Sequence, residues 1–291
     1  MIRNISAVTL GTCSGLGAYF YQRLKENERA VSNSWTNTEQ QVNPCAKWDE
    51  NWDFRNVKSL IKPLKSSPTP QEDNSYNEKV EKLKPKAIRH IYLVRHGEYL
   101  DTTDDDANHH LTETGRKQAT VTGQRLKELG IKFDRVVAST MTRAQETMEL
   151  IIKEVEFDKS KVENCSFIRE GAPAIPEPPV GHWKPEAHQF FRDGSRIEAG
   201  YRRYFHRADA SQKTDSHTLI VGHGNVIRYF FCRALQFPPE AWLRINVNHA
   251  SITKLTIYPS GRITVRTLGE AGHMPKHLLT YRIPRPDKNV V

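Results

Sequence analysis

Short apolar runs in the second half of the chain alternate with longer stretches whose apolar residues recur at helical spacing. The runs at 88–94 and 134–138 are rich in β-branched residues, which favours strands. The stretches at 112–129 and 142–155 predict amphipathic helices. Further expected elements are a strand at 217–221, a helix at 225–235, and a closing hairpin with strands at 251–258 and 262–268.

This repeated strand–helix alternation predicts an α/β domain, since such alternation is typical of a mostly parallel central sheet with helices on both faces. We expect the domain to span residues 87–291, including a C-terminal tail. The chain has no internal repeat.

The N-terminal pattern is different. Residues 5–21 carry no charge and are bracketed by Arg3 on one side and by Arg23 and Lys25 on the other. As a helix this run would rise about 25 Å, the lower limit for crossing the hydrocarbon of a bilayer. No acidic residue precedes Glu26. We therefore predict that residues 1–25 are an uncleaved mitochondrial membrane anchor, with an amphipathic or buried helix as the alternative.

Residues 26–86 are too polar to bury a core and predict a linker. Three prolines, Pro63, Pro68 and Pro70, are expected to break any helix here. The linker contains one motif, WDENWD at 48–53. Tryptophans in a polar segment need a covering surface, which is either the chain's own domain or another molecule. The residue pattern alone does not favour one of these surfaces over the other.

Composition narrows the possible partners. The mean hydropathy of −0.66 excludes a protein with several membrane spans, and the net charge of +9 suits nucleic acid, an anionic membrane or phosphorylated substrates. No nucleic-acid motif is present, so no nucleic-acid partner is expected. The four cysteines lack the spacing of a zinc or redox site, which favours a reducing compartment.

Candidate chemistry follows three of the predicted strands. The first ends at Arg95 and His96, the second leads to Arg143, and a later one ends at His223. Ligands of open α/β sheets bind beyond the carboxyl ends of the strands, so these side chains should converge on one basic pocket. The helix that begins near Asn225 would add an anion-favouring N-terminus. The implied ligand is a phosphoryl group.

His96 and His223 stand out because each follows a strand and precedes a glycine, where a phosphate could approach the backbone. The other histidines are interpreted as structural: His90, His109, His110, His182, His188, His206, His217, His249, His273 and His277.

Taken together, these motifs resemble the histidine phosphatase superfamily, also called phosphoglycerate mutase-like, over residues 87–270. The similarity lies in 93–98 (LVRHGE), 111–119 (LTETGRKQA), 139–147 (STMTRAQET) and 221–225 (VGHGN). The remaining motifs resemble one mitochondrial Ser/Thr phosphatase branch of that family: 169–173 (REGAP), 181–186 (GHWKPE), 232–239 (CRALQFPP), the anchor and the motif at 48–53.

The resemblance implies residue roles. His96 would be the nucleophile that becomes phosphohistidine, and Arg95, Arg143 and His223 would hold the phosphoryl oxygens. Glu170 would be the general acid and base. Both arginines disfavour an imidazolium, so His96 should be neutral. No metal or cofactor is required.

The resemblance also implies a function. The chain would dephosphorylate phosphoserine and phosphothreonine proteins and regulate stress-activated kinases of the apoptosis signal-regulating type. It would sit in a mitochondrial membrane, the outer favoured over the inner. It would also self-associate into higher oligomers through an assembly motif made of Trp48, Asp49, Asn51, Trp52 and Asp53.

Phosphoglycerate mutase activity is not expected, because mutases carry a longer insertion between the positions of Glu170 and His223. The alternatives are a small-metabolite phosphatase or mutase and a membrane-tethered scaffold. One position departs from the family: Thr102 stands where many members have Asn, within the acidic loop 101–106.

Overall fold

The computed structural model describes residues 47–101, 105–179 and 185–281. The predicted anchor at 1–25 and Thr102 therefore lie outside the described residues. The chain divides after Trp48 into two units, and every element named below belongs to the unit that begins at Asp49. Within the described ranges, no helix combines the length and the apolar character that a membrane crossing needs.

A single six-stranded sheet organises this unit, in the order β3-β2-β4-β1-β5-β6. The strands are β1 (Arg89–Arg95), β2 (Arg135–Ser139), β3 (Glu163–Cys165), β4 (Ser216–Gly222), β5 (Ile252–Ile257) and β6 (Ile263–Glu270). Strands β3, β2, β4 and β1 run parallel, whereas β5 is antiparallel to both β1 and β6. The sheet is thus mixed. The predicted parallel arrangement holds for β3, β2, β4 and β1, and in the predicted hairpin β5 runs in the opposite direction and β6 returns to the direction of β1.

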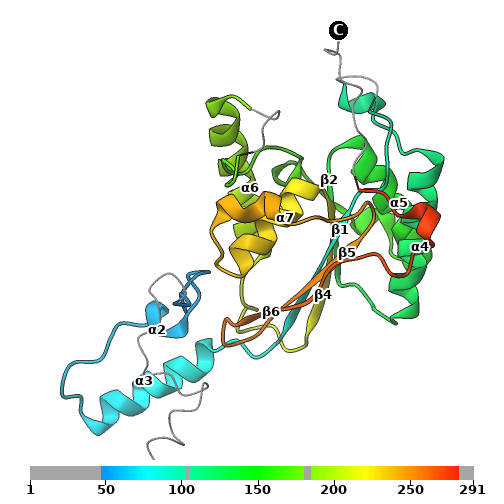
Figure 1. Ribbon diagram of the computed structural model, residues 1–291. Coiled ribbons are helices and arrows are strands. Elements are labelled where there is room, and N and C mark those ends of the chain that lie inside the picture. Colours follow the sequence, from blue (N-terminus) through cyan, green and yellow to red (C-terminus); the bar gives the residue numbers. More distant parts are fainter. Residues whose placement is uncertain (1–46, 102–104, 180–184, 282–291) are drawn as a thin grey trace, which may run out of the picture. The chain divides into compact units, whose positions relative to one another are not determined.

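Helices cover both faces of the sheet, as predicted (Figure 1). Helices α4 (Glu113–Glu128) and α5 (Thr142–Val155) pack together on one side. Helices α6 (Ala187–Tyr204) and α7 (Gly224–Ala234) lie on the other (Figure 1). The apolar face of α5 enters a core built with β1, β2 and β4. The sequence pattern did not predict α6 or the three-residue strand β3.

Two glycines bring α4 against the loop that follows β1. A Cβ atom on Gly97 would lie 2.5 Å from the carbonyl oxygen of Gly115, and one on Gly115 would lie 1.9 Å from that of Glu98. Both distances are shorter than any real contact, so only glycine fits at either position. Gly97 is therefore required by packing against α4, which adds a reason to the phosphate approach expected from the sequence.

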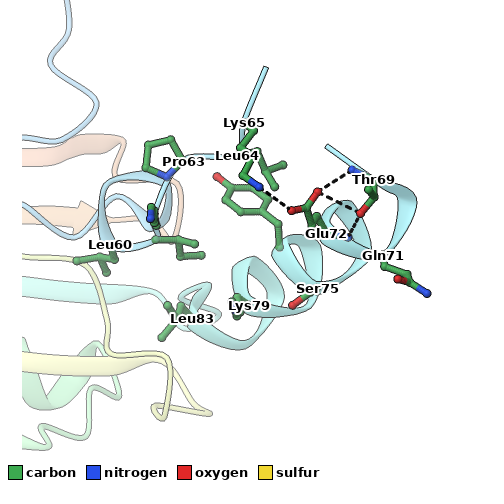
Figure 2. A pocket seen from close by; sticks show the side chains of 13 residues that line it. Leu60, Pro63, Leu64, Lys65, Thr69, Gln71, Glu72, Ser75, Lys79 and Leu83 are labelled. Carbon is green, nitrogen blue, oxygen red and sulfur yellow. Dashed lines mark hydrogen bonds and ion pairs between the residues drawn. The ribbon is translucent and has the colours of Figure 1, made fainter. Parts of the chain in front are cut away.

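The expectation that prolines break every helix in the linker is wrong for Pro70. This residue is the first of α3 (Pro70–Leu83), where a missing N–H costs nothing. Thr69 and Glu72 form a capping box, and Lys65 pairs with Glu72 at 3.4 Å (Figure 2). A groove of about 750 Å³ runs between α3 and the segment at 60–65 that follows the short helix α2 (Val57–Leu60), and no residue of the basic pocket lines it.

Candidate active site

The sheet brings the three predicted strand ends together. Strand β4 lies between β1 and β2, and Arg95 at the end of β1 is in register with Gly222 at the end of β4. The rings of His96 and His223, one residue further on, have centroids 5.2 Å apart. Their exposed fractions are only 2% and 0%. We call Arg95, His96, Arg143, Glu170 and His223 the basic pocket.

His96 is held in the tautomer that a nucleophile needs. Its Nδ1 lies 2.8 Å from the carbonyl oxygen of Gly97, which can only accept, so Nδ1 carries the proton. Nε2 therefore carries the lone pair, which accepts a hydrogen bond from Nε of Arg143 at 3.3 Å. Burial, followed by the charge of Arg143, holds the pKa of His96 well below its ordinary value. The ring is neutral, as expected, although burial contributes more than either arginine.

His223 presents a buried donor. The hydroxyl of Ser139 accepts from the backbone N–H of Met141, and its own proton can be donated to Nε2 of His223, 2.8 Å away. Nδ1 of His223 then carries the proton. Within the described residues this nitrogen is buried and has no hydrogen-bond partner. An anion in the pocket would supply the missing acceptor.

Arg95 also keeps donor capacity in reserve. Its Nη1 donates to the carbonyl oxygens of Val247 and Tyr281, at 2.7 and 2.6 Å. Its Nε is buried and, among the described residues, lacks a partner. Burial lowers the pKa of Arg95 to about 10, so the guanidinium remains charged at neutral pH. The cation is thus held by backbone oxygens and is not neutralised by the groups that hold it.

Glu170 lies at the N-terminus of α7. Its carboxylate accepts from the backbone N–H of Gly171 at 3.2 Å and from that of Asn225 at 3.4 Å. The expected anion at this helix N-terminus is therefore the pocket's own carboxylate. Burial raises the pKa of Glu170 above its ordinary value, against the opposing charge of Arg143. A carboxyl group of raised pKa suits proton transfer.

Three side chains of the pocket's surroundings were not predicted. Asp106, in the acidic loop, pairs with Arg143 at 3.0 Å and lies 3.6 Å from Arg169. The guanidinium carbon of Arg143 lies 4.6 Å from the centre of the Tyr99 ring. His249 was interpreted as structural, yet its ring centroid is 5.6 Å from that of His96. Only the density of acidic residues in the loop gave any signal.

The predicted assembly motif contacts the chain's own domain from Asp49 onward. Asp53 forms an ion pair with Arg207 at 2.9 Å, and Nε1 of Trp52 donates to the carbonyl oxygen of Gly261 at 2.8 Å. The backbone N–H of Asp49 donates to the side chain of Gln236. Asn51 accepts from Asn56 and Ser59 within the local turn. Trp48 belongs to the other unit.

Metal-ligating residues are not clustered in the pocket. Across the ranges that the structure describes, no group of three or more His, Cys, Asp and Glu side chains is arranged to hold a metal ion. The side chains that the basic pocket offers are imidazole, guanidinium and carboxyl groups.

The pocket places a buried, neutral histidine, His96, beside two arginines at the carboxyl ends of parallel strands. This arrangement is typical of a class of phosphoryl-transfer enzymes. The family model of the histidine phosphatase superfamily (branch 1) matches residues 91–270, and the chain belongs to that superfamily.

The most similar relatives point to one branch. The chain is 63% identical over 290 residues to the "Serine/threonine-protein phosphatase Pgam5, mitochondrial" of Drosophila sechellia, and 62% identical to the protein of that name in Drosophila melanogaster. Each match covers 100% of both chains. The resemblance to the mitochondrial Ser/Thr phosphatase branch is thus confirmed.

The solved structures that resemble the chain are less similar in sequence. The phosphoglycerate mutase of Plasmodium falciparum is 33% identical, covers 68% of this chain and 100% of its own, and has a TM-score of 0.46. The phosphoglycerate mutase of Bacillus anthracis is 21% identical, with coverages of 66% and 97% and a TM-score of 0.49.

Proposed function

We propose that this chain is a mitochondrial protein serine/threonine phosphatase that works through a phosphohistidine at His96. The proposal is supported by the names of the Drosophila relatives and by one observation above all. That observation is the unprotonated Nε2 of a buried, neutral His96, which accepts a hydrogen bond from the guanidinium of Arg143. The proposed nucleophile, His96, is thus in direct contact with Arg143, a cation that can stabilise the charge of the transition state.

In the first step, Nε2 of His96 attacks phosphorus and the P–O ester bond breaks. The bonding electrons move to the oxygen of the leaving serine or threonine, which takes a proton from Glu170. Arg95, Arg143 and His223 hold the non-bridging oxygens, whose charge they offset in the transition state. An alcohol is a poor leaving group without protonation, which is why the raised pKa of Glu170 matters.

In the second step, water attacks the phosphorus of phosphohistidine. The P–N bond breaks, its electrons return to Nε2 of His96, and the carboxylate of Glu170 accepts the proton of the water. Phosphate leaves and the pocket is restored. One residue thus serves as acid and then as base, as reversal of the proton flow requires.

A trapping experiment tests this function. Brief incubation with a ³²P-labelled phosphoserine peptide should leave an acid-labile, base-stable label on the protein. His96→Ala should carry no label and show no turnover. His188→Ala, which removes an exposed histidine of α6, is the matched control and should behave as the wild type. Turnover by His96→Ala would remove His96 from the proposed role.

A second arm separates the substrate classes. Protein phosphatase function predicts higher kcat/KM on phosphopeptides than on 3-phosphoglycerate, together with no mutase product. Preference for the small metabolite would favour the alternative of a metabolite phosphatase or mutase. A scaffold without catalysis predicts neither label nor turnover.

Location and partners are also proposed. Residues 1–25 should carry a fused reporter to mitochondria and leave it resistant to carbonate extraction, with the outer membrane favoured over the inner. A soluble cytosolic reporter would contradict this. Stress-activated kinases of the apoptosis signal-regulating type are the expected protein partners, and this rests on resemblance alone.

We also propose that the motif at 48–53 drives self-association into higher oligomers. Trp52 and Asp53 fit a surface that every copy of the chain carries, so the same contacts are available within or between copies. The double variant Trp48→Ala with Trp52→Ala should sediment as a smaller particle and turn over protein substrates more slowly, with an unchanged circular dichroism spectrum. An unchanged sedimentation coefficient would contradict assembly through this motif.

A further inference from the structure

His249 lies beside the basic pocket and has no role in the mechanism above. It is 1% exposed and lies in the loop that leads to β5. Its ring centroid is 5.6 Å from that of His96, at an interplanar angle of 43°. The charges of Arg95 and Arg143 act on it, and after burial they are the causes that lower the pKa of His249 to about 2. The ring is therefore a neutral imidazole beside the nucleophile.

The C-terminal segment fixes this ring. The hydroxyl oxygen of Thr280 lies 2.8 Å from Nδ1 of His249, and the backbone N–H of His249 donates to the carbonyl oxygen of Thr280, also at 2.8 Å. The next residue, Tyr281, places its carbonyl oxygen on Arg95. Thr280 and Tyr281, which are adjacent in the chain, thus hold the side chains of His249 and Arg95.

Gln118 of α4 determines which way the hydrogen bond between Thr280 and His249 runs. Its Oε1 accepts from the backbone N–H of Glu98 at 2.8 Å, which identifies the other atom as the amide nitrogen. That nitrogen donates to the carbonyl oxygen of Leu278 at 2.7 Å and to the Thr280 hydroxyl at 2.8 Å. The hydroxyl accepts from Gln118, and among the described residues the acceptor that its own proton reaches is Nδ1 of His249, which favours donation from Thr280 to His249.

This direction decides the tautomer of His249. Nδ1 accepts the hydroxyl proton, so the ring proton is on Nε2. His249 is then a neutral N–H donor at the wall of a pocket whose other donors are Arg95, Arg143 and His223. A transferring phosphoryl group has three non-bridging oxygens with several acceptor positions, more than a single donor can satisfy.

We propose that His249 is a further phosphoryl-binding residue, which donates Nε2–H to a non-bridging oxygen, and that Thr280 and Gln118 are its positioning residues. This rests on the proposed function, since it assigns another donor to the same site. The donor is neutral, so it adds a hydrogen bond without adding another positive charge beside His96. The C-terminal segment 278–281 thereby positions side chains of the phosphoryl-binding site.

The test compares anion binding with turnover in purified variants. His249→Ala should weaken the binding of orthovanadate and of inorganic phosphate, measured by calorimetry, and lower kcat/KM on a phosphopeptide, each by about tenfold to a hundredfold. His249→Asn keeps an N–H donor and guards against loss of the fold, so it should recover part of both. A loss shared by binding and turnover marks a group that touches the phosphoryl oxygens.

Thr280 offers a sharper pair. Thr280→Val keeps the shape but has no hydroxyl, so the ring loses its fixed tautomer and kcat/KM should fall by about threefold to tenfold. Thr280→Ser keeps the hydroxyl and should match the wild type. A purely structural role predicts that both variants alter the melting temperature without altering vanadate affinity.

The chain contains a matched control. Nδ1 of His90, at the opposite end of β1, lies 3.1 Å from the hydroxyl of Thr256, which is the same kind of pair outside the pocket. His90→Ala and Thr256→Val should leave vanadate affinity and kcat/KM at wild-type values. Wild-type vanadate affinity and kcat/KM in both His249→Ala and Thr280→Val would overturn the proposal.

Failure of the proposed function gives a different result. A wild-type protein that binds vanadate but neither carries label nor hydrolyses phosphopeptide contradicts the phosphatase proposal. The effect of His249→Ala on vanadate binding would then still decide whether this ring is a phosphoryl ligand.

Discussion

Two buried arginine sites in this domain are built on opposite principles. At the first, Arg207 pairs with Asp53 at 2.9 Å, and the two side chains are 2% and 0% exposed. The second site is the basic pocket. Among the described residues, the only ion-pair partner of Arg143 is Asp106, whose side chain is 24% exposed. Arg95 donates to backbone carbonyl oxygens. The charge of Arg207 is thus offset by a buried carboxylate. By contrast, Arg143 pairs with a partly exposed carboxylate, and Arg95 is held by backbone oxygens.

The difference separates structure from function. A buried charge that is paired and covered holds two segments together, and removing its partner leaves an uncompensated ion. A cluster of like charges around a neutral histidine destabilises the fold unless an anion enters, which is typical of a functional site.

The largest effect should come from breaking the sealed pair. Asp53→Asn keeps the size of the side chain but leaves Arg207 buried without a counter-charge, so the free energy of unfolding should fall by about 3–5 kcal/mol. Chemical denaturation measures this. Glu78→Gln, an exposed position of α3, is the control and should change little.

The double variant sharpens the result. Asp53→Asn combined with Arg207→Met removes both charges and should recover much of the lost stability. An Asp53→Asn protein as stable as the wild type would mean that Arg207 is not structural, and the comparison would fail.

Arg143→Met should show the opposite signature. It removes a cation that faces its like neighbour Arg95, so the melting temperature should be unchanged or higher. Turnover on a phosphopeptide should fall by about 100- to 1,000-fold, since this group stabilises transition-state charge. Steady-state kinetics and thermal unfolding of one preparation give both readings. A large loss of stability with little loss of turnover would reverse the assignments of the two sites.

The sequence pattern correctly predicts the central strands and helices of this fold. Elements β1, β2, β4, α4, α5 and α7 lie within about two residues of the predicted spans, because buried β-branched strands and amphipathic helices leave strong periodic signals. Helix α6 was missed because its buried positions, such as Ile197 and Tyr201, stand among many charged residues. Strand β3 has three residues and one buried position, which is too short for a periodic signal.

The site divides in the same way. The convergence of Arg95, Arg143 and His223 follows from the parallel strand order, which the strand–helix alternation predicts. The place of His249 does not, because it depends on Thr280 of the C-terminal segment, 31 positions away. The pairing of Asp106 likewise depends on how the acidic loop folds back over Arg143, and short-range sequence patterns contain no such information.

The dependence of kcat/KM on pH tests the proposed protonation states of His96 and Glu170. Catalysis needs His96 neutral and Glu170 protonated for the first step. The pKa of His96 lies well below its ordinary value, so acidification to about pH 6 should not remove activity on that account. The pKa of Glu170 is raised, so kcat/KM should fall at higher pH, by about tenfold per unit once Glu170 is ionised.

Glu170→Gln isolates this limb. The variant should lose most turnover of phosphoserine peptides, yet retain more on an aryl phosphate, whose leaving group needs no proton. A descending limb that persists unchanged in Glu170→Gln would assign it to another group.

The smallest expected effect concerns Asp106, the weak counter-ion of the basic pocket. Its carboxylate occupies one donor of Arg143 at 3.0 Å and lies near Arg169, so it competes with any entering phosphoryl oxygen. Because Asp106 is partly exposed, the pair contributes about 0.2–1 kcal/mol. Asp106→Asn should therefore tighten inorganic phosphate binding by only about twofold to fivefold, measured as a product-inhibition constant. Asp105→Asn, at the neighbouring residue of the loop, is the matched control. Weaker phosphate binding in Asp106→Asn would mean that this carboxylate orients Arg143 for the ligand. Asp106 would then have a structural role like that of Asp53, which would contradict the contrast between the two arginine sites.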